Sequence, residues 1–491
     1  MTTAAATTEV TREELTRLLE QQRAAHAADP IPDAATRRNR LDRFVAAVLE
    51  HATELTDALE ADFGSRPPTT SLELDILSGL TSIEATREHL EEWLAPTELP
   101  AALRGGVPAV IQHRPKGVVG IIGPWNFPVL LVFVPAAEAL AAGNRVMIKF
   151  SDMAPGTGEV FARAVASRMG PDEVVVVNGG VQTATAFSDL RFDHLFFTGS
   201  PKVGRLVGAA AGRNLVPVTL ELGGKNPAIV APDADIADAA TRIAAGRLIN
   251  NGQVCLCPDY AFVPESAKEQ FIEAYRAAVL SHFPTFEENP DVVSIVNEAN
   301  YARVTGLIQD AKAKGATEVV ILPEEERDRV LDSTMRRIPP TLLLDTSPHA
   351  EINAEEIFGP VLVVHTYADV DEAIDYVAAG EHPLSSYWYG GETAEFERFL
   401  VRTTSGGVSR NDTALAYLNH AAPFGGVGMS GSGAYHGKAG FDTFSHHRTI
   451  AQSDLPVIVA KSLVAPLPPE RVERVAAAAA EAARNAVARL S

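Results

Sequence analysis

The sequence predicts an α/β protein made of two doubly wound, Rossmann-like domains. Three observations support this prediction. Strand-like and helix-like segments alternate over most of the chain, glycines follow two of the predicted strands, and 491 residues suffice for two or three domains. Hydrophobic residues make up 46% and charged residues 21% of the chain, as in ordinary globular proteins.

The N-terminal region is predicted to be helical. Thr11 and Glu14 have the spacing of a capping box, and apolar residues follow at helical intervals from Leu15. Helical periodicity continues through residues 40–61 and 72–94, with prolines between the segments.

Strands and helices then alternate in two blocks, which predicts parallel sheets with crossover connections. In the first block we expect strands at 110–114, 117–122, 145–150, 174–178, 194–198 and 216–220, and helices at 129–142, 156–169, 183–188 and after Gly199. In the second block we expect strands at 261–263 and 361–367 and helices at 266–282 and 371–379. An edge strand at 455–459 and an alanine-rich helix from Pro468 to Ser491 complete the expected elements.

Composition excludes several classes of function. The net charge of −21 disfavours binding to nucleic acid or to anionic membranes. No segment has the length and apolarity of a membrane span, and the N-terminus lacks the pattern of a signal peptide. Two cysteines cannot form a disulfide framework, so we expect a reduced, cytoplasmic protein, and we expect no metal.

Cys255 is the candidate nucleophile. It ends the segment 250–255, where amide side chains and a glycine precede it, and the carboxylate of Glu221 is a candidate base. The alternative is that Cys255 is only a small buried hydrophobe. Cys257 is expected to fill space on the same loop. The alternative is a transient Cys255–Cys257 bridge under oxidation, whose short ring would be strained.

A glycine-containing turn at 197–204 follows a predicted strand and begins a helix. Gly199 permits a tight turn and Gly204 a close approach of helix and sheet, so free N–H groups at the helix start could face a pyrophosphate. The alternative is an ordinary strand-to-helix turn, since the usual three-glycine dinucleotide motif is absent.

Taken in order, the motifs resemble those of the aldehyde dehydrogenase superfamily over residues 40–450. They are found at 124–128, 197–204, 221–225, 250–255, 356–360 and 423–428. The segments 430–437 and 444–446 are similar to the class 3 branch, and 141–149 is similar to bacterial coniferyl aldehyde dehydrogenases.

The resemblance implies oxidation of an aldehyde to a carboxylic acid. Cys255 would attack the carbonyl carbon, the Asn126 amide and the Cys255 backbone N–H would hold the oxyanion, and Glu221 would activate water to hydrolyse the thioester. The alternatives are a turn residue for Asn126 and a solvated strand end for Glu221. The small-molecule substrate would be a hydrophobic or aromatic aldehyde, with Trp125, Phe127, Phe133, Tyr260 and 411–413 near its tunnel.

The resemblance also implies a nicotinamide dinucleotide cofactor. The adenosine ribose would lie at Lys149 and Asp152, and the carboxylate of Asp152 favours NAD, with NADP as the alternative. The remaining cofactor contacts would come from Trp125, Gly199, Ser200, Gly204, Leu222, Glu356 and Phe358, with Lys202 as a further cation near the phosphates.

By the same resemblance the chain would divide into functional parts. These are an NAD-binding domain (1–107 and 119–222), a catalytic domain (223–452), oligomerisation strands (108–118 and 453–466) and a helical tail (467–491). A homodimer is expected, with a tetramer as the alternative. Rival interpretations are a coenzyme A-acylating dehydrogenase, which the presence of Glu221 disfavours, and a non-catalytic protein on the same scaffold.

Overall fold

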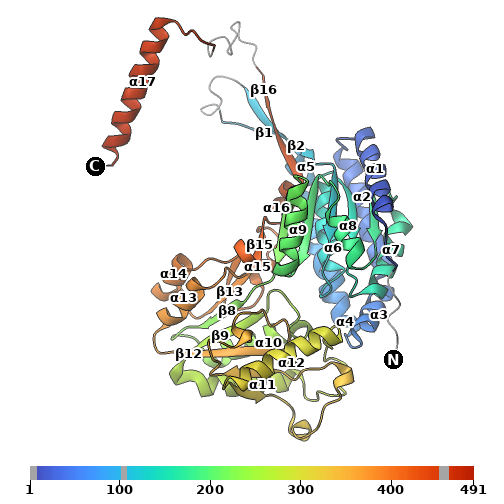
Figure 1. The fold of residues 1–491 in the computed structure, drawn as a ribbon, viewed down its shortest axis with the longest axis vertical. Helices are drawn as coiled ribbons and strands as arrows, with labels where there is room; N and C mark the ends of the chain where they lie inside the picture. Colours follow the sequence, from blue (N-terminus) through green and yellow to red (C-terminus); the bar gives the residue numbers. More distant parts are fainter. Residues whose placement is uncertain (1–7, 101–107, 453–463, 491) are drawn as a thin grey trace. The chain divides into compact units, whose positions relative to one another are not determined.

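The computed structural model describes residues 8–100, 108–452 and 464–490. The chain divides into two compact units, Met1–Ala95 with His113–His447 and Pro96–Gln112 with Arg448–Ser491. The first unit contains two mostly parallel sheets (Figure 1) and carries the candidate site. This confirms the predicted α/β fold class.

The N-terminal part of the first unit is helical. The Thr11 hydroxyl accepts the N–H of Glu14 at 3.2 Å, which caps the first helix as predicted. The elements are α1 (Arg12–Ala28), α2 (Ala34–Glu50), α3 (Ala52–Phe63), α4 (Pro68–Ser71), the π-helical turn η1 (Leu72–Leu77) and α5 (Ser78–Leu94).

Six described strands form the first sheet in the order β15-β7-β6-β3-β4-β5. All neighbours are parallel except β15 and β7. The strands are β3 (Val118–Ile122), β4 (Arg145–Lys149), β5 (Val174–Val177), β6 (His194–Gly199), β7 (Val218–Leu222) and β15 (Gly431–Ser432), and the helices are α6 (Leu130–Ala141), α7 (Pro155–Arg168), α8 (Val181–Ser188) and α9 (Pro201–Arg213). Helix α6 is buried on all sides, as its apolar sequence predicts.

Seven described strands form the second sheet in the order β10-β11-β12-β9-β8-β13-β14, parallel except for β10 and β11. They are β8 (Asn226–Val230), β9 (Pro258–Pro264), β10 (Thr317–Val320), β11 (Thr341–Leu344), β12 (Val361–Tyr367), β13 (Ser385–Tyr389) and β14 (Gly407–Arg410). The helices of this part are α10 (Ile236–Leu248), α11 (Lys268–His282), α12 (Glu298–Ala313), α13 (Val370–Ala379), α14 (Ala394–Arg402) and α15 (Leu415–Leu418), whereas α16 (Gly437–Thr443) packs against α5 and α6. Single turns of 3-10 helix are η3 (Ile249–Gly252), η4 (Glu265–Ala267), η5 (Glu324–Glu326), η6 (Ser333–Met335), η7 (Glu351–Asn353) and η8 (Gly428–Ser430).

A three-stranded sheet has the order β1-β2-β16, with β1 (Thr97–Glu98), β2 (Ala109–Pro115) and β16 (Ser445–Ala451). The strand predicted at 455–459 lies outside the described residues. Helix α17 (Pro469–Ala488) matches the predicted alanine-rich helix. None of the described helices combines the length and apolarity needed to cross a membrane.

The strand order places the site. In the first sheet, β3 is followed by β4 and β5 on one side, while β6 and β7 lie on the other. Such a reversal opens a crevice at the carboxyl ends of the strands, where α/β proteins bind ligands. Lys149, Gly199 and Leu222 are the last residues of their strands, and all three line the main cavity.

Candidate active site

A cavity of about 1700 Å³ lies between the two sheets of the first unit. Its wall contains eleven of the twelve site residues expected from sequence, namely Trp125, Asn126, Lys149, Asp152, Gly199, Ser200, Glu221, Leu222, Cys255, Glu356 and Phe358. The twelfth, Gly204, packs beside the wall, where an added Cβ would lie 2.6 Å from Leu222. The structure therefore brings the predicted residues together.

Cys255 lies at the end of a tightly fixed loop. Asn250 and Asn251 both have positive φ, 48° and 52°, in the left-handed region that asparagine tolerates better than most residues. Gly252 follows with φ 78°, and a Cβ there would lie 2.1 Å from the carbonyl oxygen of Gly359. The amide-rich sequence before Cys255 is thus required by the backbone path.

Hydrogen bonds hold this loop in place. The Gln253 side chain is fully buried, donates to the carbonyls of Asn250 and Ser294 at 3.0 and 3.1 Å, and accepts the Val296 N–H at 3.0 Å. The Asn251 amide donates to the Val293 carbonyl at 2.8 Å. The backbone entering Cys255 therefore has little freedom.

Asn226, which sequence analysis did not single out, fixes the other side of the loop. Its amide nitrogen donates to the carbonyls of Cys255 and Cys257 at 2.7 and 3.0 Å, and its oxygen accepts the Ser385 N–H at 3.0 Å. The residue starts β8 directly after the motif at 221–225. Its position directly after that motif was the only signal in the sequence.

Unlike the Cys255 loop, the Glu221 side chain is not held by hydrogen bonds to the described residues. Glu221 lies on β7, its side chain is buried, and neither carboxyl oxygen has a hydrogen-bond partner among the described residues. Burial raises the pKa of the Glu221 carboxyl well above its ordinary value. An unpartnered, desolvated carboxyl beside a cavity is a candidate general base.

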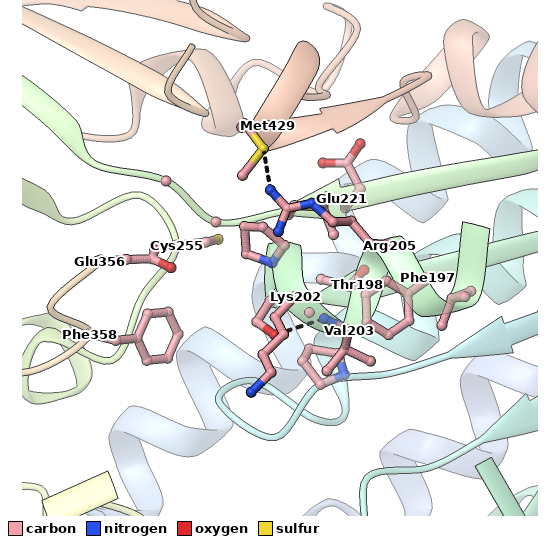
Figure 2. A pocket seen from close by; sticks show the side chains of 18 of the residues that line it. Phe197, Thr198, Lys202, Val203, Arg205, Glu221, Cys255, Glu356, Phe358 and Met429 are labelled. Carbon is pink, nitrogen blue, oxygen red and sulfur yellow. Dashed lines mark hydrogen bonds between the residues drawn. The ribbon is translucent and has the colours of Figure 1, made fainter. Parts of the chain in front are cut away.

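The Cys255 thiol is neutral in this arrangement. Burial and the carboxylates of Glu356 and Glu221 raise the pKa of Cys255 above its ordinary value. Figure 2 shows Glu356 reaching toward Cys255 from its own loop, while Glu221 extends from the first sheet. A thiolate nucleophile therefore needs a base to remove its proton.

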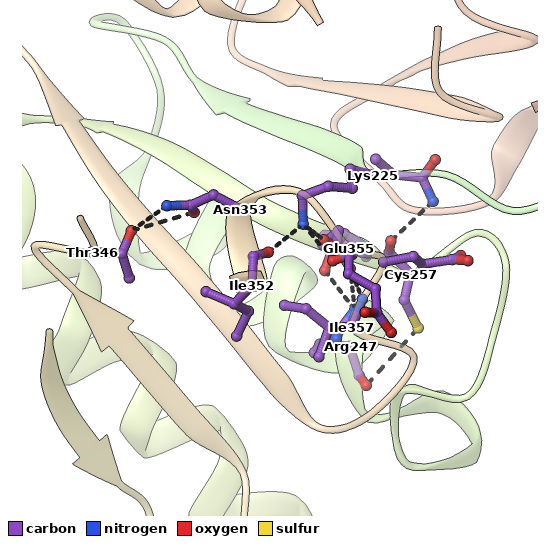
Figure 3. Close-up of polar contacts among 12 residues, drawn as sticks. Lys225, Arg247, Cys257, Thr346, Ile352, Asn353, Glu355 and Ile357 are labelled. Carbon is purple, nitrogen blue, oxygen red and sulfur yellow. Dashed lines mark hydrogen bonds and ion pairs between the residues drawn. The ribbon is translucent and has the colours of Figure 1, made fainter. Parts of the chain in front are cut away.

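Glu356 is positioned by polar contacts beneath its loop. Lys225 donates to the carbonyls of Ile352 and Glu355 at 2.8 and 3.1 Å and pairs with Asp259, which accepts the Ile357 N–H at 2.9 Å (Figure 3). Burial and the Asp259 carboxylate raise the pKa of Glu356 to about 8.

Asn126 is held at its backbone carbonyl and at its side-chain amide. Its carbonyl accepts from Arg66 at 2.8 Å and from the Asn250 amide at 3.2 Å, and its side-chain nitrogen donates to the Gln253 carbonyl at 3.1 Å. Arg66 is in turn fixed by a buried ion pair with Asp75 at 2.8 Å. The side-chain amide of Asn126 has two N–H bonds, and the hydrogen bond to the Gln253 carbonyl uses one of them.

The glycines fit an elongated ligand that passes close to the backbone. A Cβ on Gly223 would lie 2.2 Å from a Glu356 oxygen, and Gly204 brings α9 against Leu222. The predicted free N–H groups at the start of α9 are only partly present. Pro201 has no N–H, and Val203 already donates to the Ser200 hydroxyl at 3.4 Å. Lys202 and Arg205 line the same wall and supply positive charge there.

Lys149 lies at the end of β4, and its ammonium donates to the Phe150 carbonyl at 2.7 Å. Burial lowers the pKa of Lys149, while the carboxylates of Asp152 and Glu9 oppose this shift. A buried ammonium at a cavity wall suits the hydroxyls of a ribose. The donor set and the glycine-lined wall therefore fit a dinucleotide.

The sequence profile of the aldehyde dehydrogenase family matches residues 2–450. The chain belongs to the aldehyde dehydrogenase family. Its enzymes oxidise aldehydes with NAD or NADP, and this chain is accordingly an NAD(P)-dependent aldehyde dehydrogenase, which confirms the predicted enzyme class and cofactor.

Similar aldehyde dehydrogenases include coniferyl enzymes. The chain is 45% identical to a probable coniferyl aldehyde dehydrogenase of Caulobacter vibrioides, over 89% of this chain and 90% of the relative. It is 42% identical to the coniferyl aldehyde dehydrogenase of Pseudomonas sp. strain HR199, with the same coverage of both chains. The predicted resemblance to coniferyl enzymes is confirmed.

Solved structures of aldehyde dehydrogenases share the fold. The substrate-bound state of Staphylococcus aureus AldH has a TM-score of 0.85 and 33% identity, covering 94% of this chain and 99% of that one. An indole-3-acetaldehyde dehydrogenase of P. syringae, as a C302A mutant in complex with NAD+ and IAA, has a TM-score of 0.81 and 25% identity, with 90% of each chain covered.

Some residues expected near the substrate of this aldehyde dehydrogenase lie elsewhere. Phe127 and Phe133 are buried in the hydrophobic core and do not line the cavity, and Asn411 lines a separate hollow of about 420 Å³. Trp125 and Tyr260 do line the main cavity. The sequence pattern alone could not show that the side chains of Phe127 and Phe133 face the core and not the cavity.

One histidine cluster lies outside the cavity. A ring nitrogen of His113, a ring nitrogen of His447 and an oxygen of Asp442 all lie within 4.8 Å of one another. The Asp442 oxygen is already paired with the Lys438 ammonium, which disfavours a second cation.

Proposed function

We propose that this enzyme oxidises an aromatic, coniferyl-type aldehyde to its carboxylic acid, with Cys255 as nucleophile and Glu221 as base. The observation that carries the proposal is that thiol, carboxyl and the Asn126 amide reach one cavity from separate elements. Two coniferyl relatives with over 40% identity support the aromatic substrate.

The reaction would begin with removal of the Cys255 proton. Glu221 has no hydrogen-bond partner among the described residues to hold its carboxylate in place, so it can turn to accept that proton. The thiolate then forms a C–S bond with the aldehyde carbon, and the carbonyl electrons move to oxygen.

The resulting oxyanion would be held by the second N–H of the Asn126 amide and by the Cys255 backbone N–H. Asn126 is fixed through Arg66 and Gln253, so its donor is pre-positioned. Loss of one such donor typically lowers the rate by about 10²–10³-fold.

When bound, the nicotinamide supplies the hydride acceptor that converts the thiohemiacetal to a thioester. Glu221, after releasing the thiol proton to solvent, removes a proton from water, which attacks the thioester carbon. The C–S bond breaks, the carboxylate leaves, and the thiolate of Cys255 takes up the proton held by Glu221 and returns to its thiol form.

The cofactor would lie along the glycine-lined wall. Lys149 and Asp152 would bind the adenosine ribose, Gly199, Ser200 and Lys202 the phosphates, and Glu356 with Phe358 the nicotinamide ribose, while Trp125 and Leu222 complete the wall. The Asp152 carboxylate favours NAD, because it repels a 2′-phosphate.

The aldehyde would enter beside aromatic side chains. Tyr417, Phe424 and Tyr435 line the cavity together with Cys255, and Phe424 packs edge-on against both tyrosines, with ring centroids at 5.1 and 5.9 Å. Such a wall suits a planar aromatic ring.

NADH formation from coniferaldehyde, benzaldehyde, hexanal and succinic semialdehyde tests this function. We expect the highest kcat/KM for coniferaldehyde and no turnover in Cys255→Ala, with Cys257→Ala as the matched active control. A best rate with the charged semialdehyde would contradict the substrate class. Formation of an acyl-coenzyme A in place of the free acid would contradict hydrolysis.

We also propose a homodimer and the domain division expected from sequence, with the NAD-binding part around the first sheet and the catalytic part around the second. Strand β2 within 108–118 supports an oligomerisation element, whereas 453–463 lie outside the described residues. Light scattering during size exclusion would test the dimer, and a monomer at micromolar concentration would contradict it.

A further inference from the structure

The N-terminus of helix α8 is occupied by a carboxylate from the start of the chain. Glu9 accepts the N–H of Gly180 at 3.1 Å, the N–H of Thr183 at 2.8 Å and the Thr183 hydroxyl. The Val10 N–H donates to the same hydroxyl at 2.8 Å, which fixes the segment. Glu9 therefore fills the place where a helix N-terminus would otherwise bind an anion.

Helix α8 also forms part of the cavity wall, through Val181, Ala184 and Thr185. An added Cβ on Gly180, the residue before the helix, would lie 2.6 Å from a Glu9 oxygen. Glu9 is not among the residues that line the cavity, but it reaches the first turn of a helix that borders it.

Glu9 is also electrostatically coupled to Lys149. Burial lowers the pKa of Lys149, and the carboxylates of Asp152 and then Glu9 act to raise it. The Lys149 ammonium, which is proposed to bind the adenosine ribose, therefore interacts with two negative charges. Asp152 supplies one from the loop after β4, and Glu9 supplies the other from the N-terminal segment.

NADP differs from NAD by a phosphate on the 2′ oxygen of that ribose, which carries up to two negative charges. Such a group needs cations or free N–H donors. Near the ribose the Lys149 ammonium and the N-terminus of α8 are two such groups. The carboxylates of Asp152 and Glu9 already act on the first, and Glu9 accepts hydrogen bonds from the second.

We propose that Glu9 is a specificity-determining residue that disfavours NADP by occupying the anion-binding position a 2′-phosphate would use. The proposal rests on the ribose position given under the proposed function. It adds a residue far from Asp152 in sequence, in a segment that has no recognisable nucleotide-binding pattern.

The variants Glu9→Gln and Glu9→Ala test the proposal in the whole chain. Calorimetric binding of adenosine 2′,5′-bisphosphate and of 5′-AMP isolates the 2′-phosphate from the nicotinamide chemistry. Removing one negative charge several ångströms from a dianion should strengthen bisphosphate binding roughly fivefold to tenfold at low salt, with 5′-AMP binding changed less than twofold.

Steady-state rates give a second measurement. The kcat/KM for NADP+ should rise by a similar factor while that for NAD+ stays within twofold. Glu60→Gln removes an exposed carboxylate elsewhere in the first unit and should change neither ligand.

Two results would overturn the proposal. In the first, the ratio of bisphosphate to 5′-AMP affinity is unchanged in both Glu9 variants. In the second, both ligands weaken equally, which would mean that Glu9 only stabilises α8. If the wild-type enzyme bound no 5′-AMP, the ribose site itself would be wrong, which is a distinct failure.

Discussion

The loop that carries Cys255 and the strand that carries Glu221 differ in how firmly hydrogen bonds hold their reactive groups. The loop is fixed by buried amides, with Gln253 alone making three hydrogen bonds to backbone. The Glu221 carboxyl is equally buried but has no partner among the described residues. The nucleophile is thus held in one place, whereas the base is free to turn between thiol and water.

This contrast has an energetic side. A buried polar group without a partner costs stability, so the folded chain tolerates Glu221 at a cost of about 1–3 kcal/mol or more. The hydrogen-bonded loop offsets such costs nearby. The fixed nucleophile and the movable base therefore lie on different elements around one cavity.

The largest effect is expected for Glu221→Gln, which keeps the shape but removes the base. The steady-state rate should fall by about 10²–10⁴-fold. Intact-protein mass spectrometry separates the two proposed steps of Glu221: an acyl-enzyme accumulates if hydrolysis is slowed more than thiol deprotonation, and the thiol stays free in the opposite case. Because the base must be ionised, wild-type activity should rise with pH through the raised pKa of Glu221, and the variant should lose that limb.

A rate within tenfold of wild type, with the pH profile retained, would assign the base to another residue. The strand would then hold an inert carboxyl, and the contrast with the loop would have no catalytic meaning.

A smaller effect is expected for Gln253→Ala. The change leaves the Asn250 and Ser294 carbonyls and the Val296 N–H without their buried partner, so the free energy of unfolding should fall by about 3 kcal/mol. The rate should fall by about 10- to 100-fold, because a displacement of the nucleophile is costly. Urea denaturation and steady-state kinetics measure the two effects.

The exposed Gln182→Ala is the matched control, since it removes the same side chain from a surface helix. Full activity in a destabilised Gln253→Ala enzyme would show that the nucleophile does not depend on a fixed loop.

The smallest effect is expected for Glu356→Gln, and it concerns stability. The folded pKa of Glu356 is about 8, above its ordinary value, so folding favours its protonated form. The contribution is fully present below the unfolded pKa and is lost as pH rises toward 8. Between pH 5 and 7 the variant should gain roughly 2–3 kcal/mol of unfolding free energy relative to wild type.

Thermal unfolding at several pH values measures this difference, with Glu355→Gln as an exposed neighbouring control. A gap between wild type and Glu356→Gln that does not change with pH would mean that Glu356 is not buried in its protonated form.

The sequence predicted the first sheet far better than the second. Strands β3 to β7 are short, mostly apolar segments that alternate with helical patterns, and each was assigned. In the second sheet only β9 and β12 were assigned, because β8 begins with Asn226 and Pro227 and β13 begins with two buried serines. Tertiary burial makes these segments strands, and local pattern does not reveal it.

The reactive residues were identified by motif, but their supports were not. Arg66, Asp75 and Asn226 are distant in sequence from the groups they hold, and their types are common on protein surfaces. Only the folded chain shows that they are buried and what they contact. The partial loss of N–H donors at the start of α9 was equally hidden, since it depends on where the Ser200 hydroxyl points.

The position of the Cys257 sulfur determines how this enzyme responds to oxidation of Cys255. Cys257 is buried, its sulfur lies 3.2 Å from the Gly246 carbonyl, and it is not among the residues that line the cavity. A Cys255 sulfenic acid would thus have no resolving thiol within the chain, whose sequence contains no third cysteine. Reduction of such a sulfenic acid would therefore need a thiol from outside the chain.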